Sequence, residues 1–284
     1  MKKIVVRSYA KINLCLDITG TREDGYHLLD MVMIPIELHD SLLIQETPKA
    51  VDNYVTLDDF TVGDSQYNTV SMALELIDKE KPLNTKFRID LHKVIPMKAG
   101  LGGGSSNAAF VLKGINDYKK LGISEERLSE IAVKIGADVP FFVKNVPARC
   151  RGIGENVEPI HIKNDYYVLI VKPELGCSTK EVYALSDSME LKTCNLDNVI
   201  KALEEGDDEL LANSISNALQ EPAIKMVPAI QGILDDLKNH GLKIAQVTGS
   251  GSAVFALSTD KKALIKVLKE LENKYEVEIA RVIK

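Results

Sequence analysis

The amino-acid sequence predicts an α+β protein with two domains, and three observations support this. The chain has 284 residues, and at roughly 150 residues per domain two domains are expected. An alternating strand over residues 6–18 is followed by a strand, a glycine-rich loop and a helix over residues 87–121. The later part reads as strands and helices in the order of a small antiparallel α+β unit. We expect an N-terminal domain over residues 1–155 and a C-terminal domain over residues 156–284.

The N-terminal elements follow from hydrophobic periodicity. In the first strand Ile12 and Leu14 share one face, and Lys11 and Asn13 share the other, which predicts a half-buried strand. Further along the chain we expect a turn at 19–27, an apolar strand at 31–38, and a polar loop at 46–66 with at most a short strand inside it. A helix at 68–79, a strand at 87–91, a helix at 107–121, and a helix from Ser124 that ends in a left-handed cap at Gly136 should follow.

The C-terminal elements begin after a polar, glycine-rich segment at residues 149–159, where we place the domain boundary. A short buried strand is expected at 166–171. It is followed by helices at 195–219 and 223–239, a strand, tight turn and strand over 245–257, a helix from Lys261, and a final strand at 277–282. No internal repeat or low-complexity tract is visible.

The charge balance limits the possible partners. The chain carries 35 Lys and Arg against 41 Asp and Glu, a formal net charge of −6. Because polyanions are bound largely through positive charge and counterion release, this balance argues against nucleic acid as a partner. No run of 18 apolar residues occurs, so we expect no membrane partner. Oligomeric state stays open.

The cysteines indicate a reducing compartment. Cys15, Cys150, Cys177 and Cys194 lie far apart, without a C-x-x-C pair or the close spacing of a zinc site or disulfide framework. We therefore expect reduced thiols, no metal-binding residues, and a cytoplasmic protein.

The most informative motif is the segment PMKAGLGGGSS at residues 96–106. Its glycines allow successive N–H groups to turn inward, and the helix that follows adds its positive end at the same place. It is not a P-loop, which needs G-K-[ST], nor G-x-G-x-x-G, since Ser105 stands where the last glycine would be. The segment therefore indicates phosphate binding, with a flexible linker or an ordinary capped turn as the alternative.

Weaker candidates each have a structural alternative. Lys11 and Asn13 could line a cleft, although a lysine on a polar strand face is more often solvated. Asp138, two residues before Pro140, could simply cap a short helix. The turn TGSGS at 248–252 could form a hairpin or close over a phosphate.

Taken in order, four motifs resemble the GHMP kinases: AKINLCLDITGTREDGYH, GLGGGSSNAA, GADVPFF and VTGSGSAVFA. The resemblance covers essentially the whole chain. AKINL followed by G-x-R-x-D-G-Y-H is typical of the members that phosphorylate the terminal hydroxyl of 4-diphosphocytidyl-2-C-methyl-D-erythritol in non-mevalonate isoprenoid precursor biosynthesis. The resemblance implies an N-terminal ATP-binding α/β domain, a C-terminal ferredoxin-like α+β domain, and an active site in the cleft between them.

The resemblance also implies roles for individual residues. The family's catalytic lysine falls on Lys11 and its catalytic aspartate on Asp138. The ATP-phosphate loop falls on Pro96, Met97, Lys98, Ala99, Gly100, Leu101, Gly102, Gly103, Gly104, Ser105 and Ser106, with Asn68 and Asn107 near the nucleotide. The positions for the cytidine diphosphate substrate fall on Asn13, Tyr26, His27, Thr179, Tyr183, Gly249 and Ser250. The chain departs from the family at Lys98, where relatives carry a small residue, and the role of residues 144–155 stays open.

The expected activity is phosphoryl transfer from ATP with Mg²⁺. Asp138 would take or orient the hydroxyl proton, Lys11 would neutralise the transferring group, and Ser106 would be a contact for Mg²⁺. Two alternatives stay open: another GHMP small-molecule kinase of the mevalonate or homoserine type, or a non-catalytic descendant that binds nucleotide.

Overall fold

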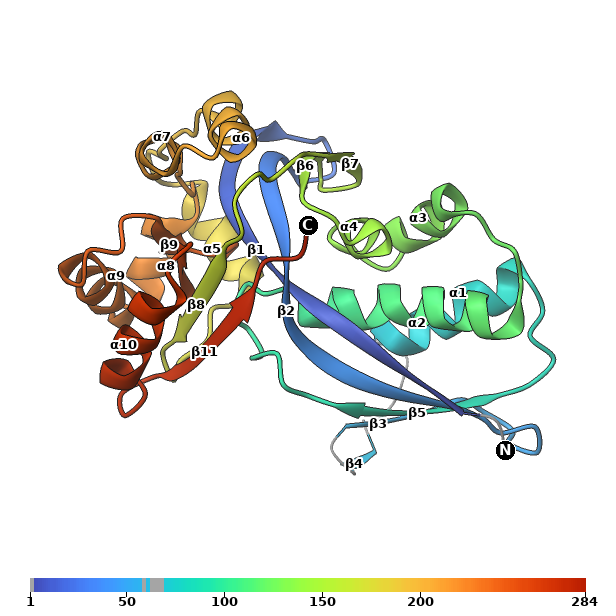
Figure 1. Cartoon of the computed structure of the whole chain (residues 1–284). Helices are drawn as coiled ribbons and strands as arrows, with labels where there is room; N and C mark the ends of the chain where they lie inside the picture. The colour runs from blue at the N-terminus through green and yellow to red at the C-terminus, as the bar shows by residue number, and fades with distance from the viewer. Residues whose placement is uncertain (1–2, 58–59, 62–68) are drawn as a thin grey trace. The chain divides into compact units, whose positions relative to one another are not determined.

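The computed structural model describes residues 3–57, 60–61 and 69–284, and the chain divides into two compact units (Figure 1). Unit 1 takes residues 1–10, 39–95 and 102–145, and unit 2 takes residues 11–38, 96–101 and 146–284. The sequence predicted one cut after residue 155. The structure differs because two long strands, β1 (Lys3–Thr21) and β2 (His27–Glu46), each contribute residues to both units.

Unit 1 contains a sheet with helices on one face (Figure 1). Strand β5 (Phe87–His92) pairs antiparallel with the end of β2 and parallel with β3 (Tyr54–Leu57), and β4 (Phe60–Thr61) pairs with β3. Alternate residues of β5 are buried, as the predicted strand at 87–91 requires. Helix α1 (Thr69–Glu80) confirms the helix predicted from residue 68 onwards, although residue 68 lies outside the described part.

The helices of unit 1 depart from prediction at their ends. Helix α2 (Gly103–Lys119) starts four residues earlier than expected, because Gly102 adopts a left-handed conformation with φ 71° that turns the chain directly into the helix. Helix α3 (Glu125–Val133) starts as predicted, with the Ser124 side chain accepting a hydrogen bond from the Arg127 N–H. The predicted left-handed cap at Gly136 is wrong, since α3 ends at Lys134 in a right-handed conformation. Helix α4 (Val139–Lys144) follows.

Unit 2 contains a four-stranded antiparallel sheet in the order β11-β8-β10-β9. Its strands are β8 (Tyr167–Lys172), β9 (Ala245–Val247), β10 (Val254–Ser258) and β11 (Glu276–Arg281). This order, with helices after the first and third strands, is that of a ferredoxin-like unit, as expected. The predicted strand, turn and strand over 245–257 is confirmed in the β9–β10 pair.

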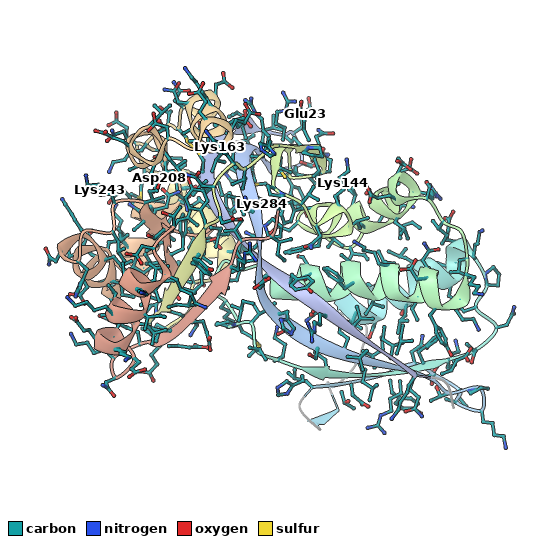
Figure 2. All side chains as sticks on the ribbon, viewed as in Figure 1. Glu23, Lys144, Lys163, Asp208, Lys243 and Lys284 are labelled. Atoms are coloured by element: carbon teal, nitrogen blue, oxygen red, sulfur yellow. A yellow bond between two sulfur atoms is a disulfide. The ribbon has the colours of Figure 1, made fainter. Side chains whose placement is uncertain are left out.

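The helices of unit 2 bury one face each. Helices α9 (Ala229–Asn239) and α10 (Lys261–Leu271) each bury apolar residues that are three or four positions apart. The predicted single helix at 195–219 is instead two shorter helices, α6 (Leu196–Glu205) and α7 (Asp208–Ser214), because Gly206 ends the first with φ 71°. Helices α5 (Thr179–Ser186) and α8 (Gln220–Met226) complete the unit. Charged side chains such as Lys163 and Lys243 lie exposed on its outside (Figure 2).

The rest of unit 2 is formed by parts of β1 and β2 together with two short strands. Strand β6 (Ala148–Gly152) pairs antiparallel with residues 29–33 of β2, and β7 (Asn156–Pro159) pairs with β6. Residues 11–16 of β1 are all buried, so the predicted half-buried strand is wrong here: both faces are covered. The backbone of Leu16 exchanges hydrogen bonds with Ser216 and Ala218, which attaches β1 to the segment before α8.

The expectation of four reduced thiols is wrong for one pair of cysteines. Cys15 and Cys194 form a disulfide although 179 positions separate them. Cys150 and Cys177 are free and buried, and burial raises the pKa of the Cys177 thiol to about 11. At neutral pH Cys177 is therefore a protonated thiol and not a nucleophile.

No helix within the described ranges is both long and apolar enough to cross a bilayer.

Candidate functional site

The glycine-rich segment forms a turn that ends at a helix N-terminus. Lys98, Gly100 and Gly102 all adopt left-handed backbone conformations, with φ of 52°, 76° and 71°. The first intrahelical bond of α2 runs from the Ser106 N–H to the Gly102 carbonyl, which leaves the N–H groups of residues 103–105 without intrahelical acceptors. A 17-residue helix that begins in this way offers N–H donors and a positive dipole end to an anion.

Two polar residues in the first turns of α2 are used inside unit 1. The Ser106 side chain is fully buried and its hydroxyl donates to the Tyr9 carbonyl at 2.6 Å. Asn107 is 2% exposed and accepts from the Ser8 hydroxyl at 2.5 Å. Both hold α2 against β1, and the hydroxyl that stays partly accessible is that of Ser105. The predicted nucleotide residue Asn68 lies outside the described residues.

Within unit 2, the start of the glycine-rich segment packs on the TGSGS turn, 148 positions further along the chain. A methyl group on Gly100 would lie 2.0 Å from the Thr248 carbonyl oxygen. The Ser252 N–H donates to the Lys98 carbonyl at 3.3 Å, and the Thr248 hydroxyl donates to the Gly100 carbonyl at 3.3 Å. Ala99 is buried beneath this contact and Met97 is exposed. The sequence indicated the glycine-rich segment and the TGSGS turn as separate candidates, and no sequence pattern predicted that they are in contact.

Lys11 and Asn13 lie directly beside the TGSGS turn. The Lys11 ammonium donates to Asn13 Oδ1, and the Asn13 N–H donates to the Thr248 hydroxyl at 2.9 Å. A methyl group on Gly249 would lie 3.1 Å from Asn13 Oδ1 and 3.4 Å from Lys11 Nζ. Lys11 is only 3% exposed, which excludes the solvated-lysine alternative in this structure. A buried ammonium is stabilised by anionic or hydrogen-bonding groups around it.

The TGSGS turn is a hairpin that also offers donors. Gly249 and Gly251 have φ of 54° and 80°, and the Gly251 N–H donates to the Thr248 carbonyl at 2.9 Å. Within the described part of the chain, the N–H groups of Gly249 and Ser250 donate to no other group. The Ser250 hydroxyl lies 2.9 Å from that of Thr179 at the start of α5. Two consecutive N–H groups that have no acceptor among the described residues, in a turn beside a buried ammonium, are donors of the kind that anion-binding loops use.

An aromatic corner lies in the same unit. The His27 and Tyr183 rings have their centroids 4.8 Å apart at an interplanar angle of 31°, and His27 Nε2 lies 2.7 Å from Asp187 Oδ1. Tyr26 is 59% exposed, at the end of a turn in which Gly25 has φ 85°. An exposed ring next to a tilted ring pair offers flat surfaces to a planar ligand. Sequence reasoning missed Asp187, which carries no local motif.

Asp138 occupies the N-cap position of α4 in unit 1, with Pro140 in the first turn, as the sequence predicted. Its side chain makes no capping hydrogen bond, and its backbone conformation, φ −82° and ψ −11°, is helical. An N-cap residue ordinarily has an extended backbone and an oxygen that accepts from the second or third N–H of the helix. The capping explanation for this aspartate therefore has no support in the geometry of α4.

The Lys98 side chain is exposed, and its stem lies over Gly176, where a methyl group would be 2.7 Å from Lys98 Cβ. The Cys177 N–H donates to the Lys98 carbonyl at 3.1 Å. The backbone of Lys98 thus fixes the loop.

We expect Lys98→Ala to leave the KM for ATP within about threefold of the original at physiological salt, because an exposed charge is screened over about 8 Å. The measurement is steady-state kinetics with varied ATP. An increase of about tenfold or more in that KM, with kcat unchanged, would show that the ammonium reaches the phosphates.

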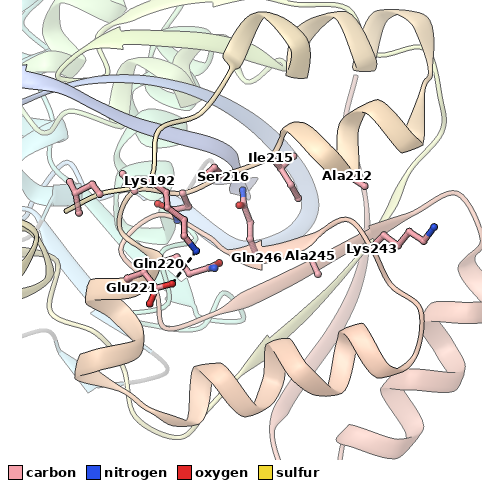
Figure 3. Close-up of a pocket in the computed structure, with 12 residues that line it drawn as sticks. Lys192, Ala212, Ile215, Ser216, Gln220, Glu221, Lys243, Ala245 and Gln246 are labelled. Carbon is pink, nitrogen blue, oxygen red and sulfur yellow. Dashed lines mark hydrogen bonds and ion pairs between the residues drawn. The ribbon is translucent and has the colours of Figure 1, made fainter. Parts of the chain in front are cut away.

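A separate pocket of about 180 Å³ lies in unit 2 (Figure 3). Its walls include Lys192, Ser216, Gln220, Glu221, Lys243 and Gln246. Lys192 and Glu221 form an ion pair of 3.3 Å at its edge. No residue assigned to the site from sequence lines this pocket.

Comparison with known proteins gives the chain's family. The sequence profile of the GHMP kinases N terminal domain matches residues 68–145, and that of the GHMP kinases C terminal domain matches residues 199–277. The 4-diphosphocytidyl-2-C-methyl-D-erythritol kinase of Clostridium tetani is 34% identical over 98% of this chain and 99% of its own length. The enzyme of the same name from Lachnoclostridium phytofermentans is 38% identical over 93% and 90%.

Solved structures agree with this assignment. A crystal structure of 4-(cytidine 5'-diphospho)-2C-methyl-D-erythritol kinase matches with a TM-score of 0.82 and 27% identity, over 99% of this chain and all of the other. A homoserine kinase from Cytophaga hutchinsonii matches with a TM-score of 0.79 at 17% identity, over 100% and 95% of the two chains, which shows a shared fold. The chain therefore belongs to the GHMP kinase family, in the group of the 4-diphosphocytidyl-2-C-methyl-D-erythritol kinases.

Proposed function

We propose that this protein transfers the γ-phosphoryl group of ATP to the terminal hydroxyl of 4-diphosphocytidyl-2-C-methyl-D-erythritol. The observation that carries the proposal is the anion site of unit 2, where Lys11, 3% exposed, lies beside the free N–H groups of Gly249 and Ser250. We take the substrate from the similar proteins reported above, which are named for it.

The start of α2 fits the triphosphate of ATP. Its first N–H groups lack intrahelical acceptors, and Gly104 and Ser105 at this end are at least partly exposed. A side chain added at Gly103 would lie 3.0 Å from Lys93 Nζ, an ammonium that is paired with Asp40. We propose that residues 96–105 hold the phosphates mainly through backbone N–H groups.

Mg²⁺ fits this site as an ion carried by the phosphates. No group of three or more His, Cys, Asp or Glu that could hold a metal occurs among the described residues, and Mg²⁺ is commonly bound through substrate phosphates with one or two protein oxygens. The partly exposed Ser105 hydroxyl fits that role better than the buried Ser106 hydroxyl, which already donates to Tyr9. When bound, the ion neutralises charge on the phosphates.

The chemistry assigned to the protein is positioning and charge stabilisation. Lys11 neutralises negative charge on the phosphoryl group, and Asn13, which accepts from its ammonium, fixes the direction of that ammonium. Asp138, at the position of the family's catalytic aspartate, accepts or orients the proton of the attacking hydroxyl. No covalent enzyme intermediate is required.

The aromatic corner is proposed to hold the cytosine. Tyr26, His27 and Tyr183 supply ring surfaces, and stacking of a base on such rings is worth about 1–3 kcal/mol. The contact between His27 Nε2 and Asp187 Oδ1 at 2.7 Å holds the imidazole ring in place beside Tyr183. The Thr179 and Ser250 hydroxyls, 2.9 Å apart, border the anion site.

The test is a coupled assay of ADP production with four acceptors: the cytidine diphosphate substrate, its uridine analogue, mevalonate and homoserine. We expect turnover with the cytidine substrate and a kcat/KM at least about tenfold lower with the uridine analogue, because a site built for the exocyclic amine leaves its partners unpaired when that group is absent. Turnover of mevalonate or homoserine in preference would favour the alternative kinases. ATP binding without turnover of any acceptor would favour the non-catalytic descendant.

A further inference from the structure

One buried amide outside the predicted site is bonded directly to the TGSGS turn. Asn217, between α7 and α8, is 4% exposed. Its Nδ2 donates to the carbonyls of Val247 and Gly249, both at 2.8 Å, and its Oδ1 accepts from the Leu219 N–H at 2.9 Å. Both amide hydrogens and the amide oxygen are therefore engaged.

Two glutamines continue this arrangement. Gln246 Nε2 donates to the Leu14 carbonyl on β1 at 2.5 Å, and Gln220 Oε1 accepts from the Val247 N–H at 3.2 Å. We call Asn217, Gln220 and Gln246 the amide clamp. Figure 3 shows Gln220 and Gln246 beside each other in the wall of the pocket described above. Through these bonds the clamp holds two segments that border the anion site. Gln246 holds β1 at Leu14, next to Asn13, and Asn217 holds the TGSGS turn at Gly249.

The bond to Gly249 has a geometric consequence for the anion site. In a trans peptide the C=O and the following N–H point in opposite directions. Because the Gly249 carbonyl points to Asn217, the N–H of Ser250 points away from the clamp. That N–H is one of the two free donors of the turn. Without Asn217 the peptide between Gly249 and Ser250 would lose the contact that fixes its orientation.

We propose that Asn217 is a positioning residue, which orients the Gly249–Ser250 peptide so that its N–H donates to the phosphate bound beside Lys11. The identity of that phosphate group rests on the proposed function; the clamp and its effect on the turn do not. An oriented N–H in a site shielded from water is effective because it needs no reorganisation when charge develops.

The test is Asn217→Asp, which keeps the shape of the side chain and replaces the double donor by an acceptor facing two carbonyl oxygens. We expect kcat/KM for the cytidine substrate to fall at least about tenfold, because the oriented N–H acts on charge that develops on the phosphoryl group beside Lys11. The KM for ATP should stay within about threefold, because the ATP phosphates are assigned mainly to residues 96–105. A second measurement does not need activity. By hydrogen exchange with mass spectrometry, three amides should exchange faster in the variant: that of Gly251, bonded to the Thr248 carbonyl within the turn, and those of Ser252 and Ala253, bonded to the Lys98 and Ala99 carbonyls of the other loop.

The matched control is Asn164→Asp, the same change in the same unit. Asn164 Nδ2 also donates to a backbone carbonyl, that of Gly206 at 3.1 Å, and to Asp208 at 3.2 Å, and none of these residues belongs to the proposed site. The control should lose stability without a change in kcat/KM at a temperature where it is folded. Unchanged kinetics and exchange in Asn217→Asp, or equal kinetic losses in both variants, would overturn the inference. An inactive original protein with faster exchange in the variant would instead count against the proposed function.

Discussion

Lys11→Ala is expected to lower kcat by about 10²–10⁴-fold while the KM for ATP changes little, because a positioned charge acts mainly as charge develops on the phosphoryl group. Lys11 is buried, bonded to Asn13 and adjacent to Gly249, so its ammonium cannot be replaced by solvent without reorganising the turn. Steady-state kinetics at saturating cytidine substrate measures the effect.

Asp138→Asn is expected to give a loss of the same order. Asn caps helices about as well as Asp, and the Asp138 side chain makes no capping bond in any case, so α4 should be unaffected. The control is Lys98→Ala, which removes an exposed lysine from the phosphate loop. A near-original kcat for Lys11→Ala or Asp138→Asn, with the control also near-original, would remove the catalytic assignment of that residue.

Gly100→Ala is expected to lower the free energy of unfolding by about 3 kcal/mol or more, and to abolish most activity. The added methyl group would lie 2.0 Å from the Thr248 carbonyl oxygen, a contact that requires movement of backbone in one of the two loops. Overpacking of this kind costs about 1–3 kcal/mol, and the left-handed φ of 76° adds about 1–2 kcal/mol for a residue with a Cβ. Denaturant unfolding measures the loss.

The matched control for Gly100 is Gly241→Ala. Gly241 has nearly the same backbone conformation, φ 77°, but no atom lies within 4 Å of an added methyl group. Its substitution should cost only the conformational part, about 1–2 kcal/mol. Equal losses of stability in the two variants would mean that the contact between the loop at Gly100 and the turn at Thr248 does not form in solution.

Local patterns in the sequence were enough for much of the fold. Apolar spacing of three and four residues located α10, alternation located β5, and the glycines of TGSGS located the turn between β9 and β10. These elements are determined by residues near one another in the chain, so a short window contains the information. The ordered motifs also identified the family and, through it, Lys11 and Asp138 as candidates.

Helix ends and strand burial were predicted less well, because each depends on a neighbour outside the window. Helix α2 starts at Gly103 because of the left-handed turn at Gly102, and its early polar residues Ser106 and Asn107 are bonded to β1. The polar face of β1 looked solvated in sequence, since nothing local shows that Lys11 would be covered by a turn more than 230 residues later.

The sequence by itself therefore determined the family and several of the elements, among them β5, α10 and the turn between β9 and β10. Only the tertiary structure decided that Gly100 touches Thr248, that Cys15 is bonded to Cys194, and that the Asn217 amide is bonded to the carbonyl of Gly249. These are contacts between residues 32 to 179 positions apart. Periodicity and propensity report the conformation of one segment, whereas such contacts arise only when packing brings separate segments together and leaves one arrangement in which their buried polar groups are bonded.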